Sequence, residues 1–373
     1  MKILIINPFG IGDVLFSMPL IRAIRQAFPE SWIGYLCNRR TEWILESSPH
    51  LNELFVYEKD DLIGLWRRSW LQGLGYLASL VKRIRGRRFD LVIDLSLGER
   101  YGLMTKLVGI PRRVGFDYRG RGRFLKERLA IDGYHDEHIV TYYRRLLQFL
   151  GITMVEDRLE LPVRAEDAAW AAQWLAAQGF MDGRTLVGIV PAGGVSWGKD
   201  APFRRWSLAG FAAAADALIE RCRAQVILFG EASDRDACRE VAHRMAQPAI
   251  DVSGQTTLGQ FVALLARLDL VMCNDGGPLH LAVSQGVKTV SIFGPVDPHV
   301  YGPYTAGRGG HVVIAEETLP CRPCYHRFRL PPCPYERACL TMIRVDDVVA
   351  ACSAALRSTE GVRGDAPAHS LAR

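Results

Sequence analysis

The sequence predicts two doubly wound α/β domains in tandem that face a central cleft, and three observations support this fold class. The chain has 373 residues, which exceeds the length that one hydrophobic core usually covers. Short apolar segments alternate with helical segments in both halves, as they do in parallel sheets covered by helices. The composition, 49% hydrophobic and 23% charged, excludes a disordered, collagenous or polytopic membrane protein. No apolar run reaches the length that a membrane-spanning helix requires.

The first half of the chain begins with a buried strand, because residues 2–7 (KILIIN) form an apolar segment rich in isoleucine. After a loop over residues 8–12, Asp13 opens an apolar-periodic helical segment that runs to Phe28. The further elements expected here are strands at 32–37, 54–57 and 89–94 and a long helix at 62–85. A polar connection over residues 151–164 then ends a first domain with the predicted bounds 1–164.

The second half repeats this alternation. The strands expected here lie at 186–191, 225–229, 269–273 and 289–293. The helices lie at 206–222, 235–245, 258–267 and 277–285. These elements predict a second domain over residues 165–344, followed by a closing amphipathic helix at 345–357. The last residues, 358–373, are small and polar with Gly and Pro, so we expect a disordered tail.

Positive charge is concentrated in the first half. Residues 1–150 carry 24 Lys and Arg against 16 Asp and Glu, whereas the remainder is close to neutral, and this asymmetry suggests an anionic partner. The nine cysteines are an odd number for a disulfide framework. Pro8, Gly10 and Gly12 interrupt the apolar core that a signal peptide would need. We therefore expect a cytoplasmic protein.

A first candidate site is the loop over residues 7–13 (NPFGIGD), between a strand and a helix. Gly10 and Gly12 allow the backbone to turn tightly and to approach a ligand closely. The spacing is not the dinucleotide-binding fingerprint, because Leu15 stands where a third glycine would be expected. Asp13 has two interpretations, the cap of the helix N-terminus or a general base at the mouth of the sheet, and one residue can serve both.

A second candidate is the glycine-rich loop over residues 191–199, which ends in Lys199. Backbone N–H groups and one ammonium group form an anion cradle in such a loop. The Walker pattern is absent, which disfavours an ATPase, and a solvated loop lysine is the simpler interpretation of Lys199.

The third candidate, residues 274–280 (NDGGPLH), gives the strongest signal. Asp275 follows a strand, and Gly276 and Gly277 precede a helix N-terminus, an arrangement suited to a nucleotide diphosphate. His280 falls near the first turn of this helix, where it could face the same ligand. A lone histidine, however, more often has a structural role. Residues 293–298 (FGPVDP) leave the next strand at the same edge of the sheet.

Two basic stretches lie in the first half. Residues 62–88 hold seven Lys and Arg and no acid, interleaved with leucines, Trp66 and Trp70. This pattern is typical of a membrane-surface helix, and equally of a core helix with a solvated basic face. The second stretch consists of Arg112, Arg113, Arg119, Arg121, Arg123, Lys126 and Arg128. Such a cluster suits a phosphorylated acceptor, whereas no nucleic-acid-binding motif accompanies it.

Four cysteines near the C-terminus have the spacing C-x2-C-x8-C-x5-C, and they are Cys321, Cys324, Cys333 and Cys339. The spacing suggests a structural metal knuckle, but only the first pair has the tight spacing of zinc ligands. Metal binding by these cysteines stays open, and we expect no catalytic role for them.

Together these motifs resemble glycosyltransferase family 9, the ADP-heptose:lipopolysaccharide heptosyltransferases. The similarity extends over residues 1–355, and its marks are residues 2–13, residues 274–280, and residues 293–298 followed by 302–304, in this order. The resemblance implies a GT-B fold, with two Rossmann-like domains facing a central cleft. In that fold the first domain would bind the acceptor and the second the nucleotide sugar.

The resemblance also implies roles for individual residues. Asp13 matches the catalytic base of the family, and Lys199 matches its phosphate-binding lysine. The family signature Asp-x-Gly-x-x-His falls on Asp275, Gly277 and His280. Where relatives commonly have Thr or Ser, this sequence has Gly276, which removes a hydroxyl group and leaves the donor preference open.

The implied reaction is an inverting transfer of a heptose without a metal or another cofactor. Asp13 would take the proton of the acceptor hydroxyl, while Lys199 and the helix N-terminus at Gly276 and Gly277 stabilise the leaving ADP. The expected partners are an ADP-sugar donor, an anionic glycolipid acceptor of the lipopolysaccharide inner core, and the cytoplasmic face of the inner membrane, where the enzyme would be peripheral. No nucleic-acid partner is expected.

Three rival functions remain at this point. One is a transferase that uses another nucleotide sugar, and another is a nucleotide-sugar 2-epimerase on the same fold. An epimerase needs no acceptor, so the basic first half would stay unexplained. The third is a non-catalytic protein that binds sugar nucleotides or lipids.

Overall fold

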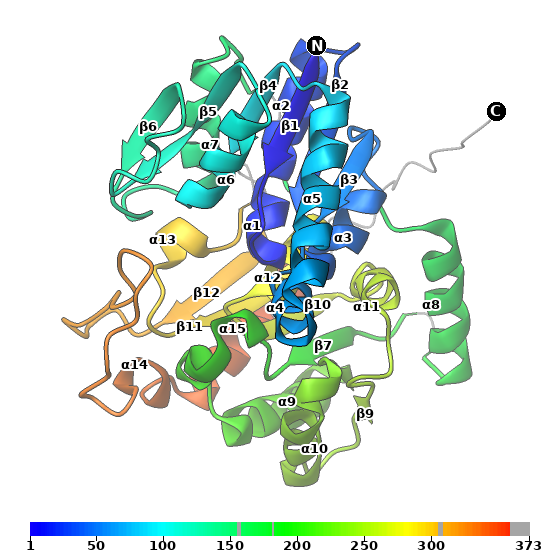
Figure 1. The fold of residues 1–373 in the computed structure, drawn as a ribbon. Coiled ribbons are helices and arrows are strands. Elements are labelled where there is room, and N and C mark those ends of the chain that lie inside the picture. Colours follow the sequence, from blue (N-terminus) through cyan, green and yellow to red (C-terminus); the bar gives the residue numbers. More distant parts are fainter. Residues whose placement is uncertain (155–157, 181–182, 305–308, 359–373) are drawn as a thin grey trace.

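The computed structural model describes residues 1–154, 158–180, 183–304 and 309–358. It confirms the predicted fold class: the chain forms two α/β domains, each built on one parallel sheet (Figure 1). Residues of both domains line a cleft between them. The tail predicted to be disordered lies outside the described residues, except for Ser358.

The first sheet has six parallel strands in the order β3-β2-β1-β4-β5-β6. Their bounds are β1 (Lys2–Ile6), β2 (Trp32–Cys37), β3 (Glu53–Val56), β4 (Leu91–Asp94), β5 (Arg112–Tyr118) and β6 (Glu127–Ile131). Strand β1 is buried on both faces, since Ile3 and Ile5 enter one hydrophobic core and Leu4 and Ile6 another. Sequence analysis missed β5 and β6 because charged residues interrupt their apolar patterns.

Helices cover both faces of this sheet. They are α1 (Ile11–Phe16), α2 (Met18–Ala27), α3 (Arg39–Glu46), α4 (Lys59–Arg68), α5 (Trp70–Arg87), α6 (Glu99–Leu107) and α7 (Ile139–Gln148). Two helices that we predicted as continuous are divided. The first breaks at Ser17, and the second breaks at Ser69, whose extended backbone (φ −163°, ψ 126°) turns the chain between α4 and α5.

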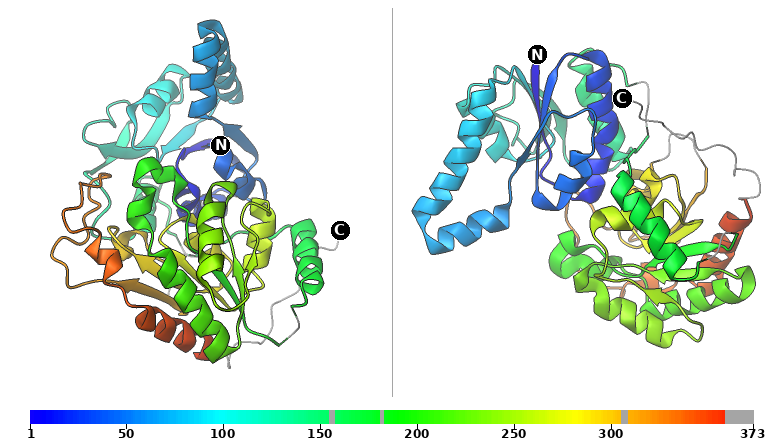
Figure 2. Two further views of the ribbon diagram at one scale, coloured as in Figure 1. Left: turned by 90° about the horizontal axis from the view of Figure 1, so that it is seen from below. Right: turned by 90° about the vertical axis from the view of Figure 1, so that its right-hand side faces the viewer.

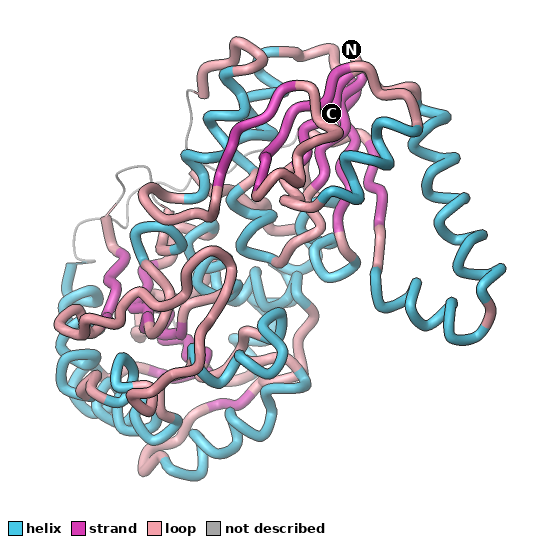
Figure 3. The backbone as a smooth tube through the Cα atoms, turned by 60° about the vertical axis from the view of Figure 1, so that its left-hand side comes forward, coloured by secondary structure: helices cyan, strands magenta, loops and turns pink. Residues whose placement is uncertain are grey.

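The second sheet repeats the same topology with six parallel strands in the order β12-β11-β10-β7-β8-β9. Their bounds are β7 (Leu186–Val190), β8 (Gln225–Leu228), β9 (Ile250–Asp251), β10 (Leu270–Asn274), β11 (Lys288–Phe293) and β12 (His311–Ala315). Figure 3 shows the strands of the two sheets as separate groups. Strands β9 and β12 escaped prediction: β9 is only two residues long, whereas β12 (HVVIA) has the β-branched apolar residues of a strand and was overlooked.

The helices of the second half are α8 (Ala165–Ala177), α9 (Leu208–Cys222), α10 (Arg235–Arg244), α11 (Leu258–Leu265), α12 (Gly277–Ser284), α13 (Pro298–Tyr301), α14 (Ala338–Thr341) and α15 (Val345–Arg357), with 3-10 helices η1 (Val195–Arg204) and η2 (Ala232–Asp234). Helices α9, α10 and α15 share one core with the sheet, and α15 has the predicted bounds. Helices α11 and α12 belong to the core that continues into the first domain. The two domains therefore meet through buried apolar contacts.

The strand order places the candidate loops together. In each sheet the first strand of the domain, β1 or β7, lies between the second and the fourth strand of that domain. Connections run away in both directions from this point, which leaves a crevice at the carboxyl ends of the strands. The loops after β1, β7 and β10 leave the sheets at these two crevices.

Candidate functional site

A cleft of about 790 Å³ lies between the two domains, a volume typical of small-molecule sites. Seven of the predicted site residues line it, and they are Gly10, Gly12, Asp13, Asp275, Gly276, Gly277 and His280. The structure does not bring Lys199 to them, because this residue is exposed outside the cleft lining. The fold thus gathers residues that are more than 260 positions apart in the chain, from Asp13 to Asp275.

Two buried or half-buried asparagines hold the loop after β1 in place. The Asn7 amide donates to the carbonyl of Asp13 (3.0 Å), and its Oδ1 accepts from the N–H of Phe9 (3.3 Å). The Asn38 amide donates to the carbonyls of Pro8 (3.2 Å) and Phe9 (2.6 Å). These bonds satisfy backbone groups of the loop and fix the start of α1.

Asp13 is the third residue of α1, and Gly10 is the N-cap. The interpretation of Asp13 as the cap is therefore wrong, because Ile11 already belongs to the helix. Burial raises the pKa of Asp13 to about 6, while the backbone N–H of Gly10 and the charge of Arg204 act in the opposite direction. A carboxyl group in a cleft with a pKa near neutrality is suited to general acid–base chemistry.

Arg204, at the end of η1, is the cation that sequence analysis missed. Its guanidinium donates through Nε (3.0 Å) and through Nη2 to Oδ2 of Asp275, and both residues are buried, 8% and 5% exposed. The guanidinium lies 4.1 Å from the ring centroid of Trp197, which packs against Tyr325 at 4.5 Å. All four residues line the cleft. No motif contains Arg204, so only its place in the fold distinguishes it from the neighbouring Lys199.

Two opposing influences act on the pKa of Asp275 in its ion pair with Arg204. Burial raises the pKa of Asp275, and the adjacent guanidinium opposes this rise. A buried carboxylate is strongly destabilised when it has no partner of opposite charge, so Asp275 favours a position of Arg204 directly beside it. This ion pair holds the guanidinium in place. A guanidinium fixed in this way at a cleft wall presents its remaining N–H groups to an anionic ligand.

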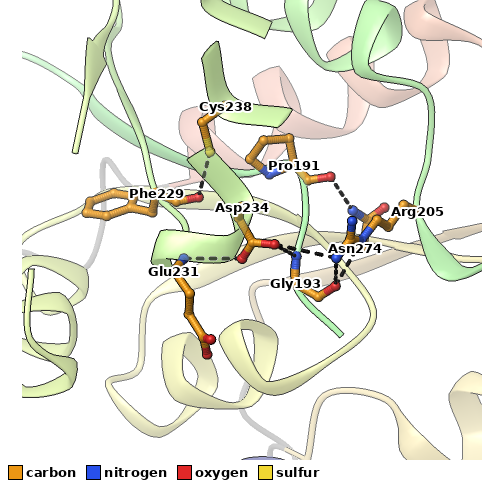
Figure 4. A network of polar contacts seen from close by, with 8 residues as sticks. All are labelled: Pro191, Gly193, Arg205, Phe229, Glu231, Asp234, Cys238 and Asn274. Carbon is orange, nitrogen blue, oxygen red and sulfur yellow. Dashed lines mark hydrogen bonds and ion pairs between the residues drawn. The ribbon is translucent and has the colours of Figure 1, made fainter. Parts of the chain in front are cut away.

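The backbone after β7 is fixed by Asp234 (Figure 4). Its carboxylate accepts from the N–H groups of Gly193 (3.3 Å) and Glu231 (3.1 Å), and the guanidinium of Arg205 lies 3.4 Å from it. Arg205 also donates through Nε to the carbonyl of Gly193 (2.9 Å). Gly193 has φ +94°, a left-handed conformation that favours glycine. The loop is therefore rigid where it lines the cleft.

The N-terminal turns of α1 and α12 approach each other closely across the domain junction. A Cβ atom on Gly12 would lie 2.8 Å from Cδ2 of His280, and one on Gly277 would lie 3.3 Å from Cβ of Ile11. Gly276, the N-cap of α12, has φ +149°. Gly12 and Gly277 thus serve the close packing of the two helices, and Gly276 serves the turn before α12.

His280 is buried and neutral, because burial lowers its pKa to about 3. Its ring packs against Phe16 at 4.5 Å, and Phe16 also contacts His138 at 4.9 Å. His138 continues the junction, with its Nε2 3.2 Å from the carbonyl of Gly302. Among the described residues, Nδ1 of His280 has no hydrogen-bond partner. His280 therefore supports the domain junction beside the cleft.

Most of the second basic stretch has structural roles. Arg112, Arg123 and Arg128 form ion pairs, and Arg113 donates to the carbonyls of Phe124 and Ile110. Of the seven residues, all of which the structure describes, Arg121 alone lines the cleft. The stretch thus mainly holds β5 and β6, and Arg121 is the residue of the stretch that contributes to the cleft wall.

The four cysteines lie in a segment between β12 and α15. Cys339 is buried, the other three are half-buried, and the N–H of Arg337 donates to Sγ of Cys333 (3.3 Å). Within the described part of the chain, no group of three or more His, Cys, Asp or Glu side chains is arranged to hold a metal ion.

Two facing Rossmann-like domains with a cleft between them form the GT-B fold. The family model of glycosyltransferase family 9 (heptosyltransferase) matches residues 77–329. This match covers more than half of the chain, so the protein belongs to glycosyltransferase family 9 and is a glycosyltransferase.

Individual relatives agree with this assignment. The chain is similar to lipopolysaccharide heptosyltransferase 2 of Escherichia coli K12, with 26% identity over 306 residues, 80% of this chain and 84% of the relative. The crystal structure of a family 9 glycosyl transferase from Veillonella parvula superimposes with a TM-score of 0.80 at 24% identity, over 96% of this chain and 98% of the other. The E. coli ADP-heptose lps heptosyltransferase II has the same fold, with a TM-score of 0.72 at 23% identity, over 96% and 99% of the two chains.

No helix among the described residues has the length and apolar character needed to cross a bilayer.

Proposed function

We propose that this enzyme transfers a heptose, or a closely related sugar, from an ADP-sugar to the lipopolysaccharide inner core, with inversion and without a metal. The observation that carries the proposal is one cleft with a carboxyl group of raised pKa on the first domain and the Arg204–Asp275 pair beside the N-terminus of α12 on the second. The names of the relatives, which include lipopolysaccharide heptosyltransferases of several bacteria, support heptose as the sugar.

In the proposed reaction the acceptor hydroxyl attacks the anomeric carbon from the face opposite the nucleotide. The new carbon–oxygen bond forms as the bond to the β-phosphate breaks, ADP leaves, and the hydroxyl proton passes to Asp13. The charge that develops on ADP would be stabilised by Arg204 and by the backbone N–H groups of Gly276 and Gly277 at the start of α12. Lys199, which the resemblance implies for this role, stays a prediction for the donor-bound enzyme.

In this proposal each domain binds one of the two substrates. We assign the acceptor to residues 1–164, because this part carries the excess of positive charge and contributes Arg121 to the cleft. We assign the nucleotide sugar to residues 165–344, which contribute the glycine-rich loops after β7 and β10. The acceptor is a glycolipid in this proposal, so the enzyme would work at the cytoplasmic face of the inner membrane.

Calorimetric titration of the purified protein with ADP, UDP and GDP, with and without EDTA, tests the donor class. We expect selective binding of ADP that EDTA does not weaken. Release of ADP from ADP-heptose with a heptose-deficient core acceptor, and the anomeric configuration of the product by NMR, test the transfer. Absence of any nucleotide binding would contradict the proposal.

One residue leaves the identity of the donor nucleotide open. Gly276 supplies no hydroxyl group beside the diphosphate position, where relatives commonly have one. If the calorimetry shows a preference for UDP, the enzyme would use a different nucleotide sugar on the same fold. Sugar-nucleotide turnover without any acceptor would instead indicate the 2-epimerase reaction.

A further inference from the structure

Four large apolar side chains are exposed around the junction of α4 and α5. They are Trp66 (49% exposed), Trp70 (67%), Leu71 (61%) and Leu74 (49%), and we call them the hairpin tip. Globular proteins rarely expose such side chains together without a partner, so this patch needs an explanation. The cleft does not provide it, because none of the four lines the cleft.

The hairpin projects from the first domain. In the right-hand view of Figure 2 and in Figure 3, helices α4 and α5 stand away from the rest of the molecule, with their shared corner farthest out. The opposite end of α5 is anchored, since Leu80 and Ile84 are buried against the sheet. At the corner, Trp66 lies so close to Gly73 that a Cβ atom there would overlap its indole ring. The two helices therefore pack against each other at the corner.

The charge around the tip is positive. Arg67 and Arg68 adjoin it; both are exposed, and neither has an ion-pair partner among the described residues. Asp60 and Asp61 lie in the first turn of α4, where Asp61 pairs with Arg39 at 2.7 Å, and the exposed Lys82 and Arg85 lie on the anchored half of α5. The projecting corner is thus apolar at its apex and cationic beside it at Arg67 and Arg68.

We propose that the hairpin tip docks the enzyme on an anionic lipid bilayer. The tryptophans and leucines would enter the interfacial region, and Arg67 and Arg68 would reach the phosphate headgroups. A second copy of the chain is a poorer occupant, because a symmetric contact would bring Arg67 and Arg68 of both copies together. The docking itself is inferred from the hairpin tip. Only the identity of the bilayer rests on the proposed function, because we take it to be the membrane that carries the glycolipid acceptor.

Cosedimentation of the full-length protein with vesicles tests the proposal. We expect binding to vesicles of phosphatidylethanolamine and phosphatidylglycerol and much weaker binding to phosphatidylcholine alone. The double variant Trp70→Ser/Leu71→Ser should bind the anionic vesicles at least about tenfold more weakly. Arg67→Gln/Arg68→Gln should weaken this binding by roughly tenfold as well, since each cation near an anionic surface contributes. The matched control, Leu107→Ser/Met342→Ser, removes two other exposed apolar side chains (74% and 49%) and should bind like the unaltered protein.

The alternatives give different results. The proposal would be overturned if the tip variant, Trp70→Ser/Leu71→Ser, bound vesicles as well as the control does. It would also be overturned if the unaltered protein did not bind anionic vesicles. A dimer in solution that the tip variant abolishes would identify a second copy as the occupant. Transfer to a deacylated, water-soluble acceptor should be unchanged in the tip variant, and its loss would mean that the tip binds the acceptor itself. A protein that binds vesicles but transfers no sugar would refute the proposed function and leave the docking intact.

Discussion

Asp13 and Arg204 lie on opposite domains of one cleft, and the charge of Arg204 affects the pKa of Asp13. Burial favours the neutral form of Asp13, and the positive charge of Arg204 favours the ionised form that can accept a proton. Arg204 is itself held by Asp275. Burial on the first domain and a cation on the second therefore act in opposite directions on the protonation state of the proposed base.

Replacing Asp13 by Asn should lower kcat roughly a hundredfold or more while leaving ADP binding nearly unchanged, because the general base is lost and the nucleotide site remains. Single-turnover ADP release and calorimetry measure the two effects. Asp94→Asn is the matched control, since burial raises the pKa of Asp94 to about 6 as well but this residue does not line the cleft. Full activity of the Asp13 variant would remove this residue from the mechanism.

The rate should depend on pH through the same carboxyl group. Transfer requires ionised Asp13, so kcat/KM should fall as the pH decreases through about 6. Arg204→Gln removes the charge that lowers the pKa of Asp13, and its acid limb should therefore move to higher pH. A pH profile measured with saturating acceptor checks this, and an unmoved limb in the variant would contradict the coupling.

Arg204 and Lys199 are competing candidates for the diphosphate. Arg204→Lys retains a positive charge beside Asp275 but loses the bidentate hydrogen bonding of a guanidinium. ADP binding should therefore weaken by about tenfold. Lys199→Ala should have a smaller effect, because Lys199 is exposed outside the cleft. Calorimetry on both variants, with circular dichroism to confirm folding, decides between them. A larger loss in Lys199→Ala would return the role to the lysine of the family motif.

At the scale of elements, α1 and α12 meet through glycines. The two helices belong to different domains, yet Gly12 adjoins His280 and Gly277 adjoins Ile11. The junction is too tight for an added methyl group at Gly12 and close at Gly277, so each motif holds one glycine that the packing of the two domains favours.

Gly12→Ala should destabilise the folded protein by about 1–3 kcal/mol, because the new methyl group overlaps the His280 ring. Chemical denaturation measures the change. Gly10→Ala is the control, since the nearest atom to its Cβ would be 3.9 Å away and its φ of −77° suits any residue. The double variant Gly12→Ala/His280→Ala should recover part of the loss, and additive effects would show that the two residues do not interact.

At the scale of the whole molecule, the cysteine-containing segment reaches from the second domain to the first. Phe328 packs on Tyr118 and Tyr134, with ring centroids 5.2 and 5.3 Å apart. The Tyr118 hydroxyl donates to the carbonyl of Arg327 (3.1 Å), whose side chain pairs with Asp132 (2.9 Å). Since Tyr118, Tyr134 and Phe328 also line the cleft, this segment closes one side of the site.

Phe328→Ala should loosen this closure and raise KM several-fold, with a smaller change in kcat, because the catalytic groups remain. Steady-state kinetics and a larger radius of gyration by small-angle X-ray scattering would show it. Tyr335→Ala, an exposed aromatic residue in the same segment, is the control and should change neither quantity. Unaltered kinetics in Phe328→Ala would mean that the segment does not hold the cleft closed.

The sequence by itself determined the alternation of strands and helices, most of the central strands, and the loops after β1, β7 and β10. These are local properties, since an uninterrupted apolar segment followed by glycines forms a strand and a turn in almost any surroundings. It also determined the family, because the motifs occur in a specific order. The polar strands β5 and β6 escaped because their partners in the sheet, rather than their own residues, make them strands.

Only the tertiary structure decided which cation enters the cleft, which glycines serve packing, and where apolar side chains remain uncovered. Arg204 meets Asp275 across 71 positions of sequence, and His138 meets Gly302 across 164. Trp66 and Trp70 belong to a basic stretch that suits a core helix or a surface helix equally, and only the projecting corner at Ser69 exposes them. Burial and charge pairing depend on what the fold brings alongside a residue, and no local pattern contains that information.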